Sequence, residues 1–438
     1  MALFKKAILF LVVLFLIKSP FGFAEEVSVE EKVKQLEGRI EVLERKLAER
    51  EEKLAEYESK FEHIDTHLLH REEGAPTFEA EGFEIGAGAT FVLQGTHNAN
   101  ATEQEDEDAT DVTYSADIEI GKEFEKINSK AFIHLEAGQG AGVEDELTVY
   151  SNVNRDADDD NNVRVTEVWY EQGLFGDKAL LTFGKLDSTA YFDNNEVAND
   201  ETTQFLGRIF RNSPAIEFPD NTVGIRTAVI PCGWLELGYG VFDADSDWED
   251  FGDNLFNIGQ VTFKTNFFGL DGNYRILGWH NDSHHTKWLD AEKIKEENYG
   301  FGLSLDQKIT DIVTLFGRYG WQDPEVYNPS ITATDGSNFS LEHSWSSGFQ
   351  ISGEPWGREN DVLAFAVGQA IPSDDYKKAD ETRNAKDESH FETYYNIYIN
   401  DHLSLSPDFQ LIFNPFGEDV TDRTQTISIY GLRAQVDF

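Results

Sequence analysis

The stretch TISIYGLRAQVDF, Thr426–Phe438, ends the chain and decides the fold. Its residues alternate between two unlike faces. One face is apolar or aromatic apart from its first residue: Ser428, Tyr430, Leu432, Ala434, Val436 and Phe438. The other face is mostly polar: Ile429, Gly431, Arg433, Gln435 and Asp437. A period of two with one apolar face predicts a β-strand that water wets on one side only.

An apolar strand at the end of a soluble β-sandwich would leave an exposed edge that invites aggregation. In an outer-membrane barrel the same strand pairs with the first strand and closes the barrel. The terminal stretch leaves both folds open, and the pattern of the whole chain decides between them.

The composition excludes several classes of protein. The chain has 438 residues with 82 acidic and 36 basic side chains, a formal charge of −46, which argues against a nucleic-acid partner. An aromatic content of 13% is too high for a disordered chain. The single cysteine, Cys232, rules out an intramolecular disulfide framework. An acidic, aromatic composition suits a barrel whose strands are apolar on one face.

The first residues have the features of a secretory signal. Lys5 and Lys6 precede the apolar run Ala7–Ile17, which has the usual length of a signal-peptide core and is too short to span a bilayer as a helix. Small residues precede a plausible cleavage point after Ala24. We therefore expect residues 1–24 to be a signal peptide.

Residues 25–72 change character, with Glu, Lys and Arg dominating. Apolar residues recur there at steps of three and four: Val33, Leu36, Ile40, Leu43, Leu47, Leu54, Tyr57, Phe61, Ile64 and Leu68. About five heptads of this kind predict a coiled coil, with a lone amphipathic helix as the alternative. A coiled coil needs partner chains, so we expect it to oligomerise the protein in the periplasm as a homotrimer. Residues 73–82 are predicted to be a linker.

From residue 83 onward the chain is a series of alternating segments, many of them near the ten residues that a tilted transmembrane strand needs. We predict sixteen strands: 83–97, 112–122, 129–138, 163–172, 178–187, 222–231, 233–243, 255–266, 270–280, 298–307, 312–322, 344–353, 361–370, 391–400, 403–413 and 425–438. Their connections alternate between long polar loops and short turns, which is typical of bacterial outer-membrane barrels and unexplained by a sandwich. The predicted fold is an all-β, 16-stranded antiparallel transmembrane barrel over residues 83–438, surrounded by lipid and lipopolysaccharide.

A barrel of this size leaves a water-filled channel, so its inward side chains decide what passes. The predicted inward charges are Arg226, Arg275, Arg318, Arg433, Glu119, Glu136 and Glu167. Opposed charges across a pore create a transverse field that selects by polarity and size. Simple solvation in the lumen is the alternative for each of them.

The third outward loop, Ser188–Asn221, is the longest and interleaves aromatic with hydrogen-bonding residues. Folded into the lumen it would narrow the pore, with rings for sugar faces and polar groups for hydroxyls. A surface lid or a subunit contact is the alternative. The candidate solute-binding and constriction residues are Phe192, Asp193, Asn194, Asn199, Asp200, Gln204, Phe205, Arg208 and Arg211.

Several motifs resemble the OprB-type carbohydrate-selective porin family. They are Gly184–Leu206 (GKLDSTAYFDNNEVANDETTQFL), Gly300–Ile309 (GFGLSLDQKI), Phe316–Trp321 (FGRYGW) and Gly357–Asp361 (GREND). The resemblance implies a sixteen-stranded outer-membrane porin for passive diffusion of sugars or similar small solutes. The heptads resemble the leading segment of related porins assigned to siderophore or iron uptake, which is the alternative function.

Other functions rest on weaker signals. Acidic runs at Glu103–Asp108 and Asp156–Asp160 would suit loop-bound calcium, with solvated loops as the alternative, and we expect no other cofactor or metal. The adjacent His284 and His285 are predicted to be surface residues. An outer-membrane enzyme or an envelope tether is a remote alternative, because Ser/His pairs such as Ser283 and His284 lack an orienting partner and no catalytic residue is expected.

Overall fold

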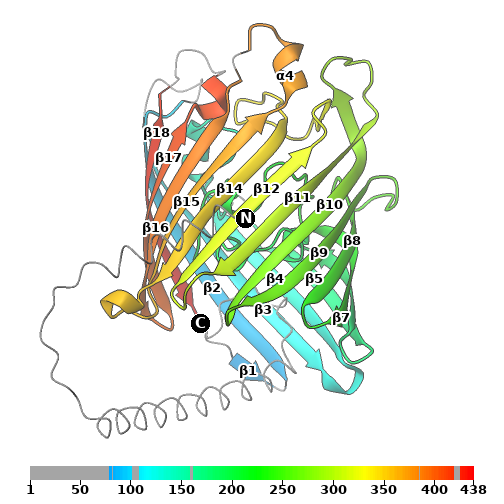
Figure 1. The fold of residues 1–438 in the computed structure, drawn as a ribbon, viewed down its shortest axis with the longest axis vertical. Helices are drawn as coiled ribbons and strands as arrows, with labels where there is room; N and C mark the ends of the chain where they lie inside the picture. The colour runs from blue at the N-terminus through cyan, green and yellow to red at the C-terminus, as the bar shows by residue number, and fades with distance from the viewer. Residues whose placement is uncertain (1–77, 81, 101–107, 158–160, 384, 419–424) are drawn as a thin grey trace, which may run out of the picture. The chain divides into compact units, whose positions relative to one another are not determined.

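The computed structural model describes residues 78–80, 82–100, 108–157, 161–383, 385–418 and 425–438. The predicted signal peptide and coiled coil lie outside the described residues, as does most of the predicted linker. The described part forms one antiparallel sheet of 18 strands that closes on itself. Two of these, β1 (Phe78–Ala80) and β13 (Val326–Tyr327), are short additions, which leaves sixteen strands in the barrel wall (Figure 1).

The wall strands are β2 (Phe83–His97), β3 (Thr110–Phe124), β4 (Ser129–Gln139), β5 (Arg164–Leu174), β6 (Ala179–Leu186), β7 (Thr222–Cys232), β8 (Leu235–Asp243), β9 (Leu255–Phe267), β10 (Leu270–Lys287), β11 (Glu296–Lys308), β12 (Val313–Gln322), β14 (Leu341–Ser352), β15 (Val362–Pro372), β16 (Glu388–Asn400), β17 (Leu403–Phe413) and β18 (Ile427–Asp437). Short helices in the connections are η1 (Glu125–Ile127), η2 (Gly142–Glu146), η3 (Ser188–Ala190), α3 (Arg208–Arg211), η4 (Glu354–Trp356), α4 (Asp374–Ala379) and η5 (Pro415–Glu418). The sixteen predicted strands are confirmed, and all but one agree at both ends to within about three residues.

The terminal strand closes the barrel as predicted. β18 pairs antiparallel with β2 from Ser428 opposite His97 to Asp437 opposite Gly88. Its outward Tyr430 is 59% exposed, whereas its inward Arg433 is 1% exposed. Both edges of the sheet are therefore paired, and the soluble sandwich is excluded.

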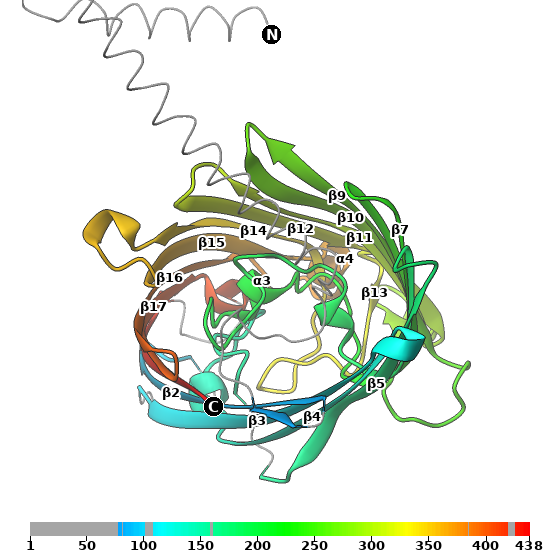
Figure 2. The same ribbon diagram turned by 90° about the horizontal axis from the view of Figure 1, so that it is seen from below.

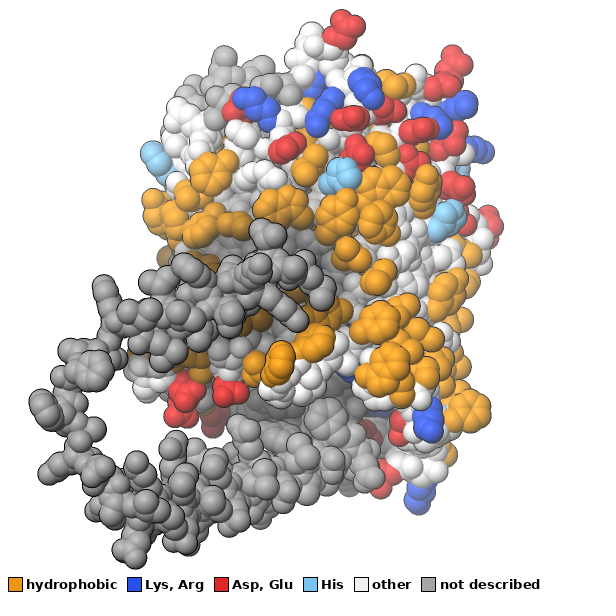
Figure 3. Space-filling view, in the orientation of Figure 1, with side chains coloured by type: hydrophobic (Ala, Val, Ile, Leu, Met, Phe, Trp, Pro, Cys, Tyr) orange, Lys and Arg blue, Asp and Glu red, His pale blue; other side chains and the backbone are white. Residues whose placement is uncertain are grey.

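The outer face of the wall is apolar. Exposed hydrophobic side chains recur along the strands, among them Phe91, Tyr239, Ile276, Phe301 and Tyr430. In Figure 3 hydrophobic side chains gather on the visible part of the wall, while charged side chains gather toward its ends. This distribution suits strands that face lipid between two aqueous boundaries. No helix among the described residues combines the length and apolarity needed to cross a bilayer.

One strand, β10, extends well beyond its predicted end. β10 continues to Lys287, past an irregularity in its pairing with β11 after Asn281, and pairs with the short strand β13 near its end. The extension carries His285 inward, where it is 0% exposed and its Nε2 lies 2.7 Å from Oε2 of Glu217. The prediction that His285 is a surface residue was therefore wrong, because the strand does not end at the predicted boundary.

Loops that fold inward fill part of the barrel. Figure 2 shows α3 and its connecting segments inside the ring of strands. Two apolar clusters join the loop Ser188–Asn221, called here the third loop, to the wall, and a third cluster joins Val143 and Leu147 to β17 and β18. The core of this protein therefore lies between the loops and the inner face of the wall, and the remaining space decides what can pass.

Candidate functional site: a charged cavity beside the third loop

The wall holds the third loop through buried side chains that point inward. The carboxylate of Glu392 on β16 accepts hydrogen bonds from the backbone N–H groups of Leu206 (2.6 Å) and Gly207 (2.9 Å). Arg433 on β18 donates through Nη1 to the carbonyl oxygen of Glu201 at 2.7 Å. Burial penalises charged groups that lack partners, and the loop backbone supplies hydrogen-bond partners to both of these side chains.

Strands on another part of the wall hold the start and the end of the loop. Arg318 on β12 donates through Nη2 to the carbonyl oxygen of Asp193 at 2.9 Å and through Nη1 to that of Phe210. The Asn195 amide donates to the carbonyl oxygen of Leu305 on β11 at 2.9 Å. The third loop is thus fixed inside the barrel, and a surface lid is excluded.

The aromatic residues of the third loop are packing residues. Phe192 and Phe205 are 0% and 1% exposed. Phe192 meets the edge of Phe242, and Phe205 meets the edge of Tyr394 with ring centroids 5.0 Å apart. The expectation that these two rings contact a passing solute was wrong, because the wall covers the faces that a sugar would need.

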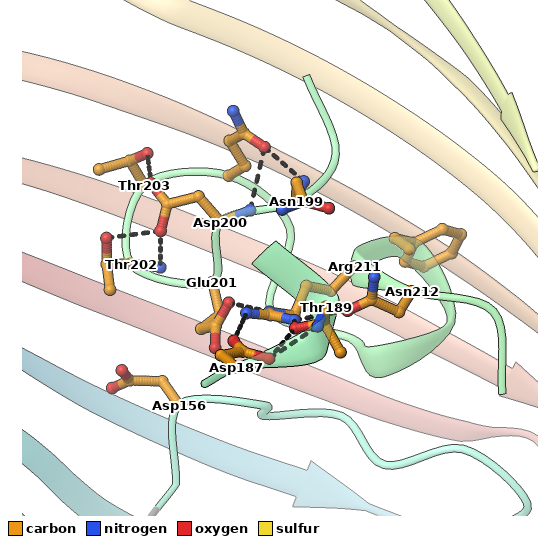
Figure 4. Close-up of polar contacts among 12 residues, drawn as sticks. Asp156, Asp187, Thr189, Asn199, Asp200, Glu201, Thr202, Thr203, Arg211 and Asn212 are labelled. Atoms are coloured by element: carbon orange, nitrogen blue, oxygen red, sulfur yellow. Dashed lines mark hydrogen bonds and ion pairs between the residues drawn. The ribbon is translucent and has the colours of Figure 1, made fainter. Parts of the chain in front are cut away.

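Arg211 organises the polar side of the loop (Figure 4). Its Nε pairs with Glu201, its Nη1 donates to Oγ1 of Thr189 at 2.8 Å, and its Nη2 lies 3.7 Å from Asp187. Burial raises the pKa of the Glu201 carboxyl, but Arg211 and then Arg155 outweigh burial, so that the pKa lies below its usual value. Glu201 and Arg211 therefore form a charged pair, and Arg211 contributes little uncompensated positive charge.

Asp200 begins a tight turn beside this pair (Figure 4). Its Oδ1 accepts hydrogen bonds from the Thr202 N–H at 2.8 Å and from the Thr202 hydroxyl at 2.7 Å, and the Thr203 hydroxyl donates to Oδ2. The Gln204 side chain accepts from the Asn199 N–H at 2.7 Å. These local bonds hold the segment 199–203 in one conformation along a cavity.

That cavity has a volume of about 800 Å³ and lies inside the barrel. Its acidic lining residues are Asp117, Glu119, Glu136, Asp156, Glu167, Asp187, Asp200, Glu201, Asp220, Asp401 and Asp437. Its basic ones are Arg155, Arg164, Lys185 and Arg211, joined by His134. Uncharged polar lining comes from Ser115, Thr166, Asn199, Thr202, Thr203, Asn221, Asn360, Asn396, Tyr398, Asn400, Ser404 and Gln435. Asp220 belongs to a long loop and Asp401 to a short turn at the opposite end of the wall, so the cavity extends along the barrel.

Only part of the predicted site lies on this cavity. The residues that do are Asn199, Asp200, Arg211, Glu119, Glu136 and Glu167. Asn194, Gln204 and Arg208 belong to the third loop but not to the cavity lining. Asp193 is fully buried, with its carboxylate 3.3 Å from Nε of Arg318.

The four arginines predicted to line the pore do not line the cavity. Arg226, Arg275, Arg318 and Arg433 are each at most 5% exposed, and none of them lines the cavity. Two of them pair with wall carboxylates, since Arg226 lies 3.3 Å from Glu171 and Arg275 lies 2.6 Å from Asp306. Arg318 and Arg433 bond to the third loop, and Arg226 and Arg275 pair with wall carboxylates, so none of the four offers its guanidinium to a solute in the cavity.

Sequence reasoning did not place Arg155, Asp156 or Arg164 on the pore, although Asp156 was a candidate for calcium. The first two belong to the second outward loop, whose inward course leaves no periodic signal. Arg164 was missed for a different reason. The pairing of β4 with β5 shifts register between Glu167 and Val165, so the inward–outward alternation that holds at Glu167 does not continue to Arg164. The acidic residues Glu103–Glu107 and Asp158–Asp160, proposed for calcium, lie outside the described residues, whereas Asp156 is buried beside Ser115.

A closed sixteen-stranded barrel with an apolar outer face, an inward third loop and a polar internal cavity defines a porin of the bacterial outer membrane. The model of the family described as "Carbohydrate-selective porin, OprB family" matches residues 103–438. The chain belongs to the OprB carbohydrate-selective porin family. Both fold and family are those of a channel and not of an enzyme.

Individual relatives are distant. The chain is 23% identical over 317 residues to Porin AaxA of Chlamydia pneumoniae, covering 69% of this chain and 63% of that protein. It is 22% identical over 274 residues to Porin AaxA of Chlamydia trachomatis serovar L2, covering 61% and 54%. The match thus spans less than two thirds of the length of these relatives.

Solved structures support the fold. The high-pH structure of Pseudomonas putida OprB superposes with a TM-score of 0.66 at 15% identity, covering 82% of this chain and 94% of that one. The outer-membrane channel DcaP of Acinetobacter baumannii gives a TM-score of 0.51 at 12% identity, covering 82% and 99%. At these identities the likeness concerns the barrel and not the solute.

Proposed function

We propose that this chain forms a passive diffusion pore for small hydrophilic solutes, with carbohydrates as its principal substrates. The observation that carries the proposal is the internal cavity of about 800 Å³, whose uncharged lining is rich in hydroxyl and amide groups. Such groups donate and accept hydrogen bonds and so replace water around sugar hydroxyls. The family description, which names carbohydrate selectivity, supports the same solute class.

In this proposal the third loop sets the narrow part of the pore. Asn199, Asp200, Thr202 and Thr203 present polar groups on one side of the cavity, and Tyr398 of β16 contributes an aromatic ring to the lining. The loop aromatics support this rim from behind, and the buried arginines hold the loop against the wall. A narrowing built on so many buried contacts is rigid, which favours selection by solute size.

Liposome swelling tests the pore. In vesicles containing the full chain we expect rates that fall steadily from pentose to hexose to disaccharide to trisaccharide, because a polar path of fixed width sieves by size. Empty vesicles and vesicles with heat-denatured protein give the background rate. Swelling no faster than this background would end the proposal.

The resemblance of residues 25–72 to the leading segment of related siderophore porins supplies the second candidate solute class, ferric siderophores. The two classes are separated by blocking the ionic current through a planar bilayer with maltooligosaccharides or with a ferric siderophore. Block by the oligosaccharides alone supports carbohydrate diffusion, whereas block by the siderophore alone replaces it with iron uptake.

We also propose that residues 25–72 join three chains through a periplasmic coiled coil. Deleting them should leave the single-channel conductance of each barrel unchanged, because the barrel begins at Phe83. The deletion should weaken the trimer, as measured by light scattering in detergent at decreasing protein concentration. An unaltered trimer at the lowest concentration would assign assembly to the barrel alone. Absence of a channel in both forms would support an envelope tether, whereas loss of conductance in the deletion alone would mean that the pore needs the helices.

A further inference from the structure

The cavity is strongly acidic. Among the described lining residues, eleven are Asp or Glu and four are Arg or Lys. One of the four, Arg211, is already paired with Glu201 and lies near Asp187. The net charge of the lining residues is therefore negative, whether or not His134 is protonated.

A second observation, independent of this count, identifies a particular acceptor. Asp156 lines the cavity and is 9% exposed. Its Oδ1 accepts a hydrogen bond from Ser115 at 2.8 Å, whereas its Oδ2 is buried and has no hydrogen-bond partner among the described residues. Figure 4 shows that none of the dashed contacts drawn among Asp187, Glu201 and Arg211 reaches this carboxylate. A buried acceptor without a donor is costly, and because Asp156 lines the cavity, a donor that enters the cavity would relieve this cost.

The strongest charge effects on Asp156 come from other carboxylates. Burial, followed by the negative charges of Glu201, Asp117 and Glu136, raises the pKa of the Asp156 carboxyl well above its usual value. Of these neighbours, Glu201 forms an ion pair with Arg211, and Asp117 lies 2.9 Å from Nε2 of His134. A cation at Oδ2 would reduce the mutual repulsion of the carboxylates and use the free acceptor at the same time.

We propose that the pore contains a cation subsite at Asp156 and conducts positively charged solutes in preference to neutral and anionic ones. For carbohydrates this means that protonated amino sugars pass faster than their neutral counterparts. An ammonium group offers three donors to the carboxylates, and a small metal ion offers charge alone. The inference rests on the proposed function, since it requires the cavity to be the solute path.

Reversal potentials across planar bilayers test the charge preference. The full chain in a KCl gradient should pass K⁺ at least about five times as readily as Cl⁻. Asp156→Asn should reduce this ratio at least about twofold while retaining open channels. Asp311→Asn, the same substitution at an exposed residue outside the cavity, should leave the ratio unchanged.

Matched sugars separate a solute site from simple ion selectivity. Glucosamine and glucose differ little in size, so we expect faster glucosamine entry in the wild type and a smaller difference in Asp156→Asn. Replacing KCl by CaCl₂ measures the preference for a divalent over a monovalent metal ion. If Asp156→Asn does not insert, Asp117→Asn, which removes a neighbouring carboxylate, should lower the same ratio.

Two results would overturn the inference. One is a wild-type channel that passes Cl⁻ as readily as K⁺ and glucose as readily as glucosamine. The other is an equal loss of selectivity in Asp156→Asn and Asp311→Asn, which would assign the preference to the overall charge of −46. Absence of any channel contradicts instead the proposed function.

Discussion

Removing the third loop should raise the single-channel conductance several-fold. Residues 199–203 line the cavity, and the buried rings of Phe192 and Phe205 fill the space between this rim and the wall. A sixteen-stranded wall alone encloses a wide aqueous channel. Leu186 and Thr222 are directly paired across β6 and β7, so a short Gly/Ser linker can replace residues 191–218. The measurement is conductance in planar bilayers at fixed salt.

A single-site experiment controls for disturbance of the barrel by the deletion. Cys232 is the only cysteine, so Cys232→Ser provides a background in which Thr203→Cys introduces one thiol on the cavity lining. A bulky thiol reagent should then reduce the current by about half or more. The same reagent on Ile309→Cys, an exposed position outside the cavity, should have no effect. Unchanged conductance after both the deletion and the labelling would place the solute path elsewhere.

The strands were predictable because the environment imposes one simple rule on all of them. Lipid outside and polar contacts inside require alternation in every wall strand, independently of its neighbours. Alternation stops being a guide where a strand no longer lies between lipid and the barrel interior. Near His285 the strand β10 continues beyond the predicted boundary and pairs with β13, whose partner residues are distant in sequence.

The site was less predictable because alternation gives the direction of a side chain and not what covers it. Arg318 and Arg433 do point inward, yet the third loop covers them. The buried aromatic rings of the third loop were unpredictable for the same reason. An ideal Cβ on Gly240 would lie 2.9 Å from the ring of Phe192, so a glycine on the wall makes room for this ring. That complementarity between a loop and a strand leaves no local pattern in the sequence.

Arg318→Ala should be the most destabilising single substitution among the loop anchors. The side chains of Arg318 and Asp193 are 1% and 0% exposed, with Nε 3.3 Å from Oδ1. Removing the arginine leaves the buried Asp193 carboxylate without its positive partner, and it leaves the carbonyl oxygens of Asp193 and Phe210 without the guanidinium donor. Losing one partner of a buried pair costs about 3–5 kcal/mol. Equilibrium urea unfolding in phospholipid vesicles, followed by tryptophan fluorescence, measures this loss.

The pH dependence and a second variant identify the carboxylate as the cause. Burial raises the pKa of Asp193, and Arg318 opposes this effect. Without the arginine the folded protein binds a proton more readily than the unfolded chain, so the deficit in unfolding free energy should narrow as the pH falls. Arg318→Ala combined with Asp193→Asn should recover part of the loss, whereas Lys378→Ala, which removes an exposed charge, should change nothing measurable. A deficit that is independent of pH and not relieved by Asp193→Asn would assign the effect to lost packing of the arginine instead of to the unpaired charge.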